Sequence, residues 1–149
     1  MIEGVLGRDA EVAAFVAARI KAARGFGDCA AVAWVDGDEL VAGTVYHNWY
    51  PEHGTIELSS AAKHPRWLTR KSLRQMFDYP FNQLGCQMVV LRVGEHNARM
   101  RNIARRFGFA ETVIPRMRGR DEADCIYTLT VEQWREKEAK YGMGTAESA

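Results

Sequence analysis

The sequence predicts a single α/β domain built on a mixed sheet. Its 149 residues, 47% of them hydrophobic, are enough for one domain with a sizeable core. Segments with apolar residues at helical spacing alternate with strand-like apolar runs, in the order helix, three strands, helix, strand, helix, hairpin. Because a helix joins the third and fourth strands, we expect those two to be parallel within a sheet that otherwise consists of hairpins.

The first half of the chain predicts one helix and three strands. Residues 10–23 have helical spacing, and Asp9 is expected to cap the helix. Strand-like runs at 29–35 and 39–50 flank an Asp-Gly pair, which is a hairpin signal. A third strand is expected at 54–62.

The middle of the chain predicts a helix followed by a buried strand. An apolar stripe marks a helix within residues 63–85, where Pro80 should bend or end it and Gly85 should stop the segment. Residues 86–93 form a nearly continuous apolar run, which is typical of a strand buried on both faces.

A third helix is predicted within "EHNARMRNIARRFGF", residues 95–109. Asn97 is a good N-cap, and Gly108 occupies the position after the last turn. One face of this helix is apolar, formed by Met100, Ile103, Ala104 and Phe107.

The C-terminal part predicts a hairpin, a short helix and a tail. Strands are expected at 109–117 and 124–130, and a helix at 131–142. We expect the folded domain to occupy residues 1–141 and a frayed tail to occupy 142–149.

The net charge of +1 conceals an asymmetry. Residues 63–120 contain thirteen Lys or Arg and three acids, so this segment carries +10 and the remainder −9. Arginine outnumbers lysine fifteen to five, and its forked guanidinium suits phosphate. The pattern leaves open an anionic ligand on one face or a solvated basic surface.

The cysteines and histidines do not indicate a metal site. The three cysteines lie far apart in apolar runs, which indicates buried small side chains in a reducing, cytoplasmic compartment. The four histidines lack the spacing of zinc ligands, so we expect no metal. We also expect no membrane association, since no apolar run approaches the ~20 residues of a membrane span.

Two motifs resemble the GNAT (Gcn5-related N-acetyltransferase) superfamily, and within it the RimJ/RimL-like branch and related phage proteins. Asn97 followed by "ARMRNIARRFGF" is similar to the family's Asn and later Leu-Gly-Phe, with Phe107 in place of the Leu. The stretch "DCIYTLTVEQW", residues 124–134, resembles the closing strand and helix of that branch. The resemblance implies a GNAT-like fold, with a mixed, mostly antiparallel sheet of six to seven strands and helices on both faces.

The resemblance also implies acetyl-CoA as cosubstrate. The family binds the pyrophosphate at a helix N-terminus through a glycine-containing loop, whereas the matching "RWLTRKSL" here has no glycine. Its basic side chains and hydroxyls are then expected to hold the phosphates, or else they simply begin a solvated helix. The residues concerned are Arg66, Thr69, Arg70, Lys71 and Ser72.

Further cofactor contacts are implied on the third predicted strand and the third helix. The family's thioester carbonyl accepts a backbone N–H from the strand segment that matches Ser59, Ser60 and Ala61. Asn97 would hydrogen-bond the pantetheine arm, and Arg101 would lie within reach of the phosphates.

Glu57 is the candidate catalytic base. Many family members carry a Glu at this strand position, and an amine must be deprotonated before it can attack a thioester. Alternation places Glu57 and Ser59 on one face of the strand, opposite Ile56 and Leu58. The pattern alone also allows a surface carboxylate. The family's thiolate-protonating Tyr is absent, because Ala104 occupies its position.

The resemblance implies an amine acceptor: a protein N-terminus, a lysine or a small amine. Loops 24–28 and 47–54 should bound its site, where Trp49 and Tyr50 either contact substrate or pack against the loop. The alternative is a GNAT-fold protein that binds or modifies nucleic acid, or binds a partner, through the basic block. A homodimer is compatible with either hypothesis, and the sequence leaves the oligomeric state open.

Overall fold

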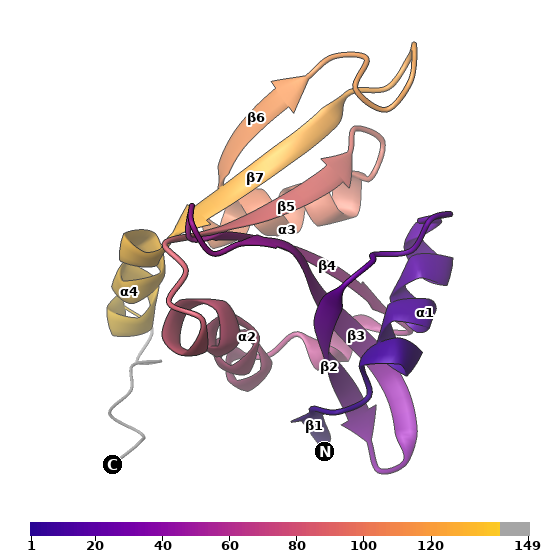
Figure 1. Ribbon diagram of the computed structural model, residues 1–149, viewed down its shortest axis with the longest axis vertical. Coiled ribbons are helices and arrows are strands. Elements are labelled where there is room, and N and C mark those ends of the chain that lie inside the picture. The colour runs from indigo at the N-terminus through magenta and orange to yellow at the C-terminus, as the bar shows by residue number, and fades with distance from the viewer. Residues whose placement is uncertain (141–149) are drawn as a thin grey trace.

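A seven-stranded sheet runs through the molecule (Figure 1), and the computed structural model describes residues 1–140. The strands are β1 (Ile2–Val5), β2 (Cys29–Asp36), β3 (Glu39–Tyr50), β4 (Thr55–Ala62), β5 (Met88–Gly94), β6 (Ala110–Ile114) and β7 (Asp124–Thr130). The α-helices are α1 (Asp9–Ile20), α2 (Arg70–Asp78), α3 (Ala98–Phe107) and α4 (Val131–Lys140). The predicted α/β fold with helices on both faces of a mixed sheet is confirmed.

The strand order is β1-β2-β3-β4-β5-β7-β6, and only β4 and β5 are parallel among the described strands. This confirms the parallel pair predicted around the middle helix. Their pairing is short, running from Thr55 opposite Met88 to Glu57 opposite Val90. Both strands continue beyond that point, so they separate in the middle of the sheet (Figure 1).

Among the helices of residues 1–140, α1 alone covers one face of the sheet. Val12 and Val16 of this helix are fully buried against small and β-branched residues of β2 and β3, namely Ala31, Ala33, Val35 and Val45. The helix approaches closely because Gly43 of β3 has no side chain. A Cβ atom there would lie 2.6 Å from Cγ1 of Val12.

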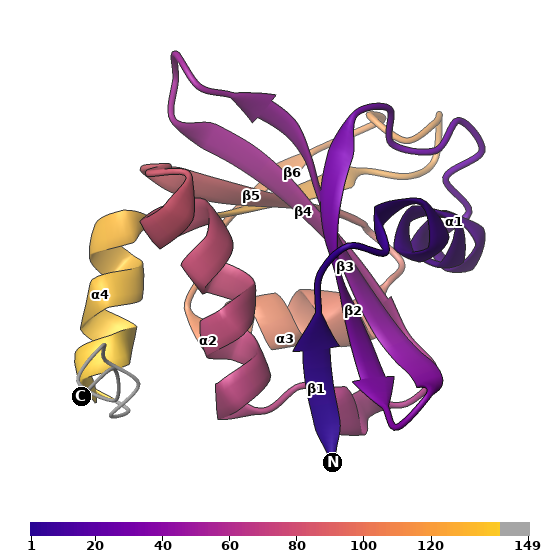
Figure 2. The ribbon, with the colours of Figure 1, turned by 60° about the horizontal axis from the view of Figure 1, so that its bottom comes forward.

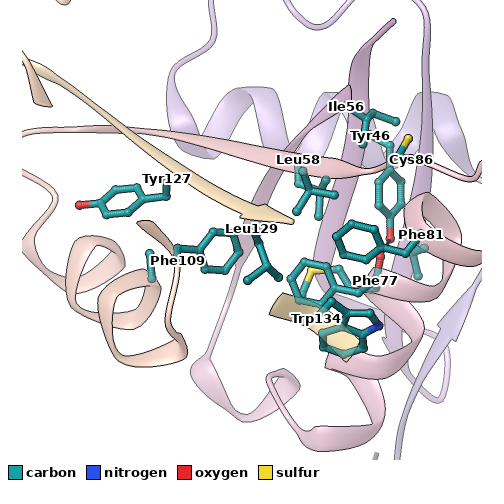
Figure 3. Close-up of a cluster of buried hydrophobic side chains, with 14 of the residues drawn as sticks. Tyr46, Ile56, Leu58, Phe77, Phe81, Cys86, Phe109, Tyr127, Leu129 and Trp134 are labelled. Atoms are coloured by element: carbon teal, nitrogen blue, oxygen red, sulfur yellow. Dashed lines mark hydrogen bonds between the residues drawn. The ribbon is translucent and has the colours of Figure 1, made fainter. Parts of the chain in front are cut away.

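The other face is covered by α2, α3 and α4 (Figure 2), which enclose the larger core. Aromatic rings dominate this core, and the rings of Phe77 and Trp134 lie 4.8 Å apart (Figure 3). Ile56 and Leu58 of β4 face into it, so Glu57 between them points to the α1 face. The predicted alternation along this strand is therefore confirmed.

The helix ends follow local side-chain chemistry. Thr69 and Ser72 form a capping box at the start of α2, since each hydroxyl accepts the other residue's backbone N–H. The α-helix ends at Asp78, and a π-helical turn containing Pro80 follows, in line with the predicted bend. Gly85 has a φ of 71°, which favours glycine where the segment stops.

The third helix begins and ends as predicted. Asn97 caps α3 by accepting the backbone N–H of Met100 at 3.2 Å. Gly108 adopts the left-handed conformation that ends the helix, with a φ of 104°. On the predicted apolar face, Ala104 is fully buried in the core.

Several details of the sequence-based fold prediction were wrong. Asp9 does not cap α1: it lies in the first turn, and its carboxylate accepts the N–H of Ala31 at 3.1 Å. The short edge strand β1 was not predicted. Strand β5 is buried on one face only, through Val89 and Val93, because its other face carries Arg92 toward solvent.

The remaining bounds are close to those predicted. Strand β7 coincides with the predicted 124–130, whereas β6 is shorter than the predicted 109–117. The expected end of the domain at residue 141 and the expected tail at 142–149 lie outside the described residues.

Candidate active site

The separation of β4 and β5 creates the candidate site. Beyond Glu57 the register pairs β4 with β3 alone, through Ser59 opposite Val45 and Ala61 opposite Gly43. The edge of β4 that faces β5 is therefore not covered by strand pairing from Leu58 onward. Exposed backbone donors beside a gap between strands are a common place for ligands in such sheets.

Glu57 lies where the two strands part, with 15% of its side chain exposed. Asn48 donates its side-chain amide to Oε1 of Glu57 at 2.9 Å, and Oε2 lies 3.8 Å from Nε2 of His47. Asn48 thus holds one carboxylate oxygen, and His47 lies near the other. The structure brings the predicted base to the gap between the strands.

His47 is the cross-strand partner of Glu57 on β3. Its Nε2 hydrogen-bonds with the hydroxyl of Ser59 at 2.9 Å, and its ring lies 4.7 Å from that of Phe26. Burial lowers the pKa of His47; the Glu57 carboxylate partly opposes this effect, and the charge of Arg92 adds to it. His47 is therefore neutral at pH 7.

A buried carboxylate on β7 completes this face. Asp124 has no exposed surface; its Oδ2 accepts Nε and Nη2 of Arg92, at 2.8 and 2.6 Å, and its Oδ1 accepts Nε of Arg118 at 2.9 Å. Two guanidinium groups thus share one buried carboxylate. Pairing of this kind is what a buried charge requires.

A hollow of about 320 Å³ lies on the α1 face, between the end of α1, the loop after it and the sheet, and its lining includes His47, Glu57, Arg92 and Arg118. A second hollow of about 280 Å³ adjoins it and is lined by Tyr50 and Val90, among others. Asn48, Glu57 and Arg92 line both hollows. A molecule in either one would contact the carboxylate of Glu57.

The other residues predicted on β4 point in alternate directions. Ser59 lines the first hollow, and Ala61 packs beside α1. Ser60 faces the opposite side, where its hydroxyl lies 2.9 Å from that of Thr44. All three lie on the part of β4 beyond its pairing with β5, where the predicted backbone contact would be made.

The predicted phosphate-binding residues gather at the start of α2. Arg66, Arg70 and Lys71 are exposed there. Ser72 is buried, and its hydroxyl donates to the carbonyl of Trp67 at 2.6 Å. Thr69 and Ser72 therefore serve the capping box, and the basic side chains lie beside a helix N-terminus, where the helix dipole favours an anion.

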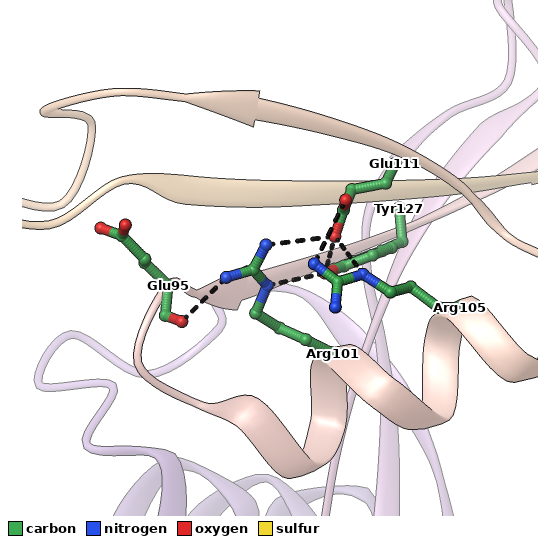
Figure 4. A network of polar contacts seen from close by, with 5 residues as sticks. All are labelled: Glu95, Arg101, Arg105, Glu111 and Tyr127. Atoms are coloured by element: carbon green, nitrogen blue, oxygen red, sulfur yellow. Dashed lines mark hydrogen bonds and ion pairs between the residues drawn. The ribbon is translucent and has the colours of Figure 1, made fainter.

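Arg101 is engaged within the protein (Figure 4). It donates to the hydroxyl of Tyr127 at 3.1 Å, the carbonyl of Glu95 at 3.1 Å and the carboxylate of Glu111 at 3.3 Å. Arg105 also donates to Glu111, at 3.0 Å. A phosphate contact by Arg101 would have to replace this network.

The same network bears on the nucleic-acid alternative. Four arginines of the basic block lie on α3, where they could form a basic strip, but two of them, Arg101 and Arg105, are paired with Glu111. Arg99 and Arg106 are exposed and remain candidates for such contacts. The strip is thus weaker than the sequence suggested.

The structure also places Ala104, Trp49 and Tyr50, the three remaining positions that the sequence singled out. Ala104, at the position of the family's Tyr, is 1% exposed and belongs to the core. Trp49 and Tyr50 end β3, which has the bounds of the predicted strand 39–50, and they are 46% and 50% exposed. Tyr50 lines the second hollow and stacks on His53.

Sequence reasoning missed several residues of the site, chiefly Asn48, Arg92, Arg118 and Asp124. Asn48 has a φ of 49°, within an irregular stretch of the β3–β4 register, and Asn tolerates that conformation. A charged Arg92 inside an otherwise apolar strand was the available signal. Nothing local connects it to Asp124, thirty-two residues later.

Neither a metal site nor a membrane span emerges within residues 1–140. No group of three or more potential metal ligands occurs among them, and their three cysteines are free thiols. No helix in this range is long and apolar enough to cross a membrane.

Comparison with known proteins bears on the family. A sequence profile of the acetyltransferase (GNAT) domain matches residues 5–110, well over half of the chain. No curated protein matches the sequence significantly.

Solved acetyltransferases share the fold. Mutant forms of the spermidine/spermine N-acetyltransferase of Vibrio cholerae are 14% identical, with a TM-score of 0.66 over 75% of this chain and 70% of theirs. The dodecameric spermidine N-acetyltransferase of the same organism is 12% identical, with a TM-score of 0.68 over 89% and 95%. A GCN5-related N-acetyltransferase from Brucella melitensis is 18% identical, with a TM-score of 0.59 over 72% and 53%. At such identities the likeness establishes the fold, and together with the profile match it means that the chain belongs to the acetyltransferase (GNAT) domain family and is an N-acetyltransferase.

Proposed function

We propose that this enzyme transfers an acetyl group from acetyl-CoA directly to a primary amine, with Glu57 as the base. The observation that carries the proposal is the position of Glu57. Its carboxylate lies where β4 and β5 separate, is held by Asn48 on one oxygen, and borders two hollows on the α1 face. A base at this position can serve an amine in either hollow.

Glu57 would act on the amine before or during its attack. An aliphatic amine is mostly an ammonium ion at neutral pH and has no lone pair to donate, so one proton must be removed. The carboxylate first attracts the ammonium and then takes that proton. His47 is neutral and hydrogen-bonded to Ser59, so it does not compete for the carboxylate as a cation.

Acetyl-CoA, when bound, supplies the acetyl group as a thioester, so that a C–N bond forms, the C–S bond breaks and the thiol leaves with a proton. The chain fits such a cosubstrate in two respects. The edge of β4 at Ser59–Ala61 is free of strand pairing and carries small side chains. Next along the chain, Arg66, Arg70 and Lys71 lie at the N-terminus of α2, where the helix dipole favours an anion.

Two positions at α3 also bear on acetyl-CoA: its cap Asn97, and Ala104, which stands where the family has its Tyr. Asn97 uses its side-chain oxygen to cap α3, and its amide nitrogen would be the group that meets the pantetheine arm. Ala104 cannot protonate a leaving thiolate, so the proton that makes it a thiol would come from solvent or from the amine itself. Catalysis then depends on Glu57 and on positioning.

The fold alone does not specify which kind of primary amine accepts the acetyl group. Structural neighbours include enzymes described as acting on spermidine, whereas the sequence motifs resemble the RimJ/RimL-like branch. A protein N-terminus, a lysine and a small amine all satisfy the requirement for a primary amino group. The charged side chains that line the hollow bear on which of these amines binds there.

Calorimetric titration with acetyl-CoA tests the cosubstrate directly. We expect saturable binding that Arg70→Ala weakens about tenfold or more, because a charge-assisted phosphate contact contributes roughly 1.5–3 kcal/mol. Arg120→Ala is the matched control, since Arg120 is exposed in the β6–β7 connection and lines neither hollow. Absence of binding at millimolar acetyl-CoA would refute the proposal.

A further inference from the structure

The hollow beside Glu57 carries both signs of charge. Its lining includes one carboxylate, that of Glu57, and three basic side chains, those of Lys21, Arg92 and Arg118. A site for a purely cationic acceptor would be expected to be lined by acids. Here the basic groups outnumber the acid, even though an amine must enter.

Arg92 and Arg118 are both held in place by Asp124 beneath the hollow. Both use their Nε atoms on the fully buried Asp124, and their side chains remain 42% and 39% exposed. One buried carboxylate faces two guanidinium groups, so Asp124 offsets only one of their two positive charges. Arg118 meets Asp124 through its Nε atom, so Asp124 does not occupy the two Nη groups of Arg118.

This arrangement suits an oxyanion. A guanidinium fixed along one edge presents its remaining N–H groups in a set direction, which favours contact with carboxylate or phosphate. Asp124 takes Nε and Nη2 of Arg92 but only Nε of Arg118, so Arg118 can offer its two Nη groups and Arg92 its Nη1. Arg92 and Arg118 come from different segments, β5 and the β6–β7 connection, yet they line the same hollow because Asp124 joins them. Glu57 lines that hollow too.

We propose that the acceptor is a small zwitterionic amine, that is, a primary amine carrying a carboxylate or phosphate a few bonds away. The oxyanion would bind Arg92 and Arg118, and the amino group would then face Glu57. A polyamine would be disfavoured, because its second ammonium would meet the guanidinium groups. This inference rests on the proposed function and names the substrate class of the same site.

Matched amine pairs test the inference by binding and by turnover. The probes are β-alanine against its amide, 2-aminoethyl phosphate against ethanolamine, and spermidine. With the enzyme saturated by CoA, calorimetry should show the anionic member of at least one pair binding at least tenfold more tightly than its uncharged partner. With acetyl-CoA, kcat/KM should follow the same order, with spermidine below the preferred anionic amine. The preferred pair would also distinguish carboxylate from phosphate.

In the preferred pair, Arg118→Gln should bring the ratio of the two amines' binding affinities close to one. Arg120→Gln should leave that ratio unchanged. Gln keeps much of the side-chain length, and Arg92 still pairs with Asp124, so the variant should fold; its melting temperature checks this. Equal binding of both members of each pair, or a preference for spermidine, would overturn the inference while leaving amine acetylation standing. Failure to bind acetyl-CoA would instead refute the proposed function.

Discussion

His47 shows how burial sets the chemistry of a single side chain in the site. Removal from water lowers the pKa of its imidazole, and the nearby charge of Arg92 acts in the same direction. The ring is therefore neutral and hydrogen-bonds with Ser59 at 2.9 Å. In this state His47 leaves the carboxylate of Glu57 available to an incoming ammonium.

Glu111 allows a prediction at the same scale. The hydrogen bond from Tyr127, and then those from Arg105 and Arg101, lower the pKa of Glu111 to about 2. A carboxyl whose pKa is lower in the folded state stabilises the protein above its unfolded pKa of about 4.3. That stabilisation is lost as the pH falls through this window toward about 2. Wild type should thus exceed Glu111→Gln in free energy of unfolding at pH 7, and the difference should shrink below pH 4.

Urea denaturation of both proteins at pH 7, 4 and 3 provides the measurement. Glu136→Gln is the control, because Glu136 is exposed on α4 and lies outside this network. A difference between wild type and Glu111→Gln that is the same at all three pH values would contradict the assignment. The hydrogen bonds would then not depend on the ionised carboxylate.

At the scale of elements, the contact between α1 and the sheet depends on Gly43. A Cβ atom at this position would lie 2.6 Å from Val12 and 3.0 Å from Val16, both fully buried. Gly43→Ala should therefore displace α1 and lower the free energy of unfolding by about 1–3 kcal/mol, as overpacking typically does. Because α1 ends at the first hollow, acceptor binding should weaken as well.

Gly94→Ala is the matched control for this substitution. A Cβ atom on Gly94 would also meet an atom at 2.6 Å, but that atom is the carboxylate end of Glu122, a flexible side chain that can move aside. Chemical denaturation of both variants should show a clear loss for Gly43→Ala and a small one for Gly94→Ala. Similar losses for the two would argue against tight packing of α1.

Local signals in the sequence predicted most elements of the whole molecule. The cap at Asn97, the helix end at Gly108 and the strand at 124–130 each follow from a few neighbouring residues, and the structure has all three. The central parallel pair followed from chain order. Glu57 was placed on the correct face of its strand by alternation.

The parts that could not be predicted depend on contacts between distant segments. Arg92 meets Asp124 only because β5 pairs with β7, and the network of Arg101 requires Glu111 on β6. Pairing between strands that lie far apart in the sequence produces no periodic pattern of residues from which it could be predicted. The short strand β1 was missed because four residues are too few to show alternation.

In the whole molecule, the two substrates would bind in different places around the central gap of the sheet. Basic side chains at the start of α2 would meet the phosphates of acetyl-CoA, and the hollow beside α1 would take the amine. The gap between β4 and β5 connects them, with Glu57 at the point where the pairing ends. At that gap, Glu57 would take the proton from the amine that attacks the thioester.

Steady-state acetyl transfer by wild type and Glu57→Gln at pH 7 tests this claim most directly, using the best amine of the panel above. We expect Glu57→Gln to lower kcat about 100-fold or more, as loss of a general base typically does, with unchanged affinity for acetyl-CoA. Glu52→Gln, at an exposed position in the β3–β4 turn, should retain wild-type turnover. If Glu57→Gln keeps wild-type kcat while binding acetyl-CoA normally, Glu57 is not the base and the account is contradicted.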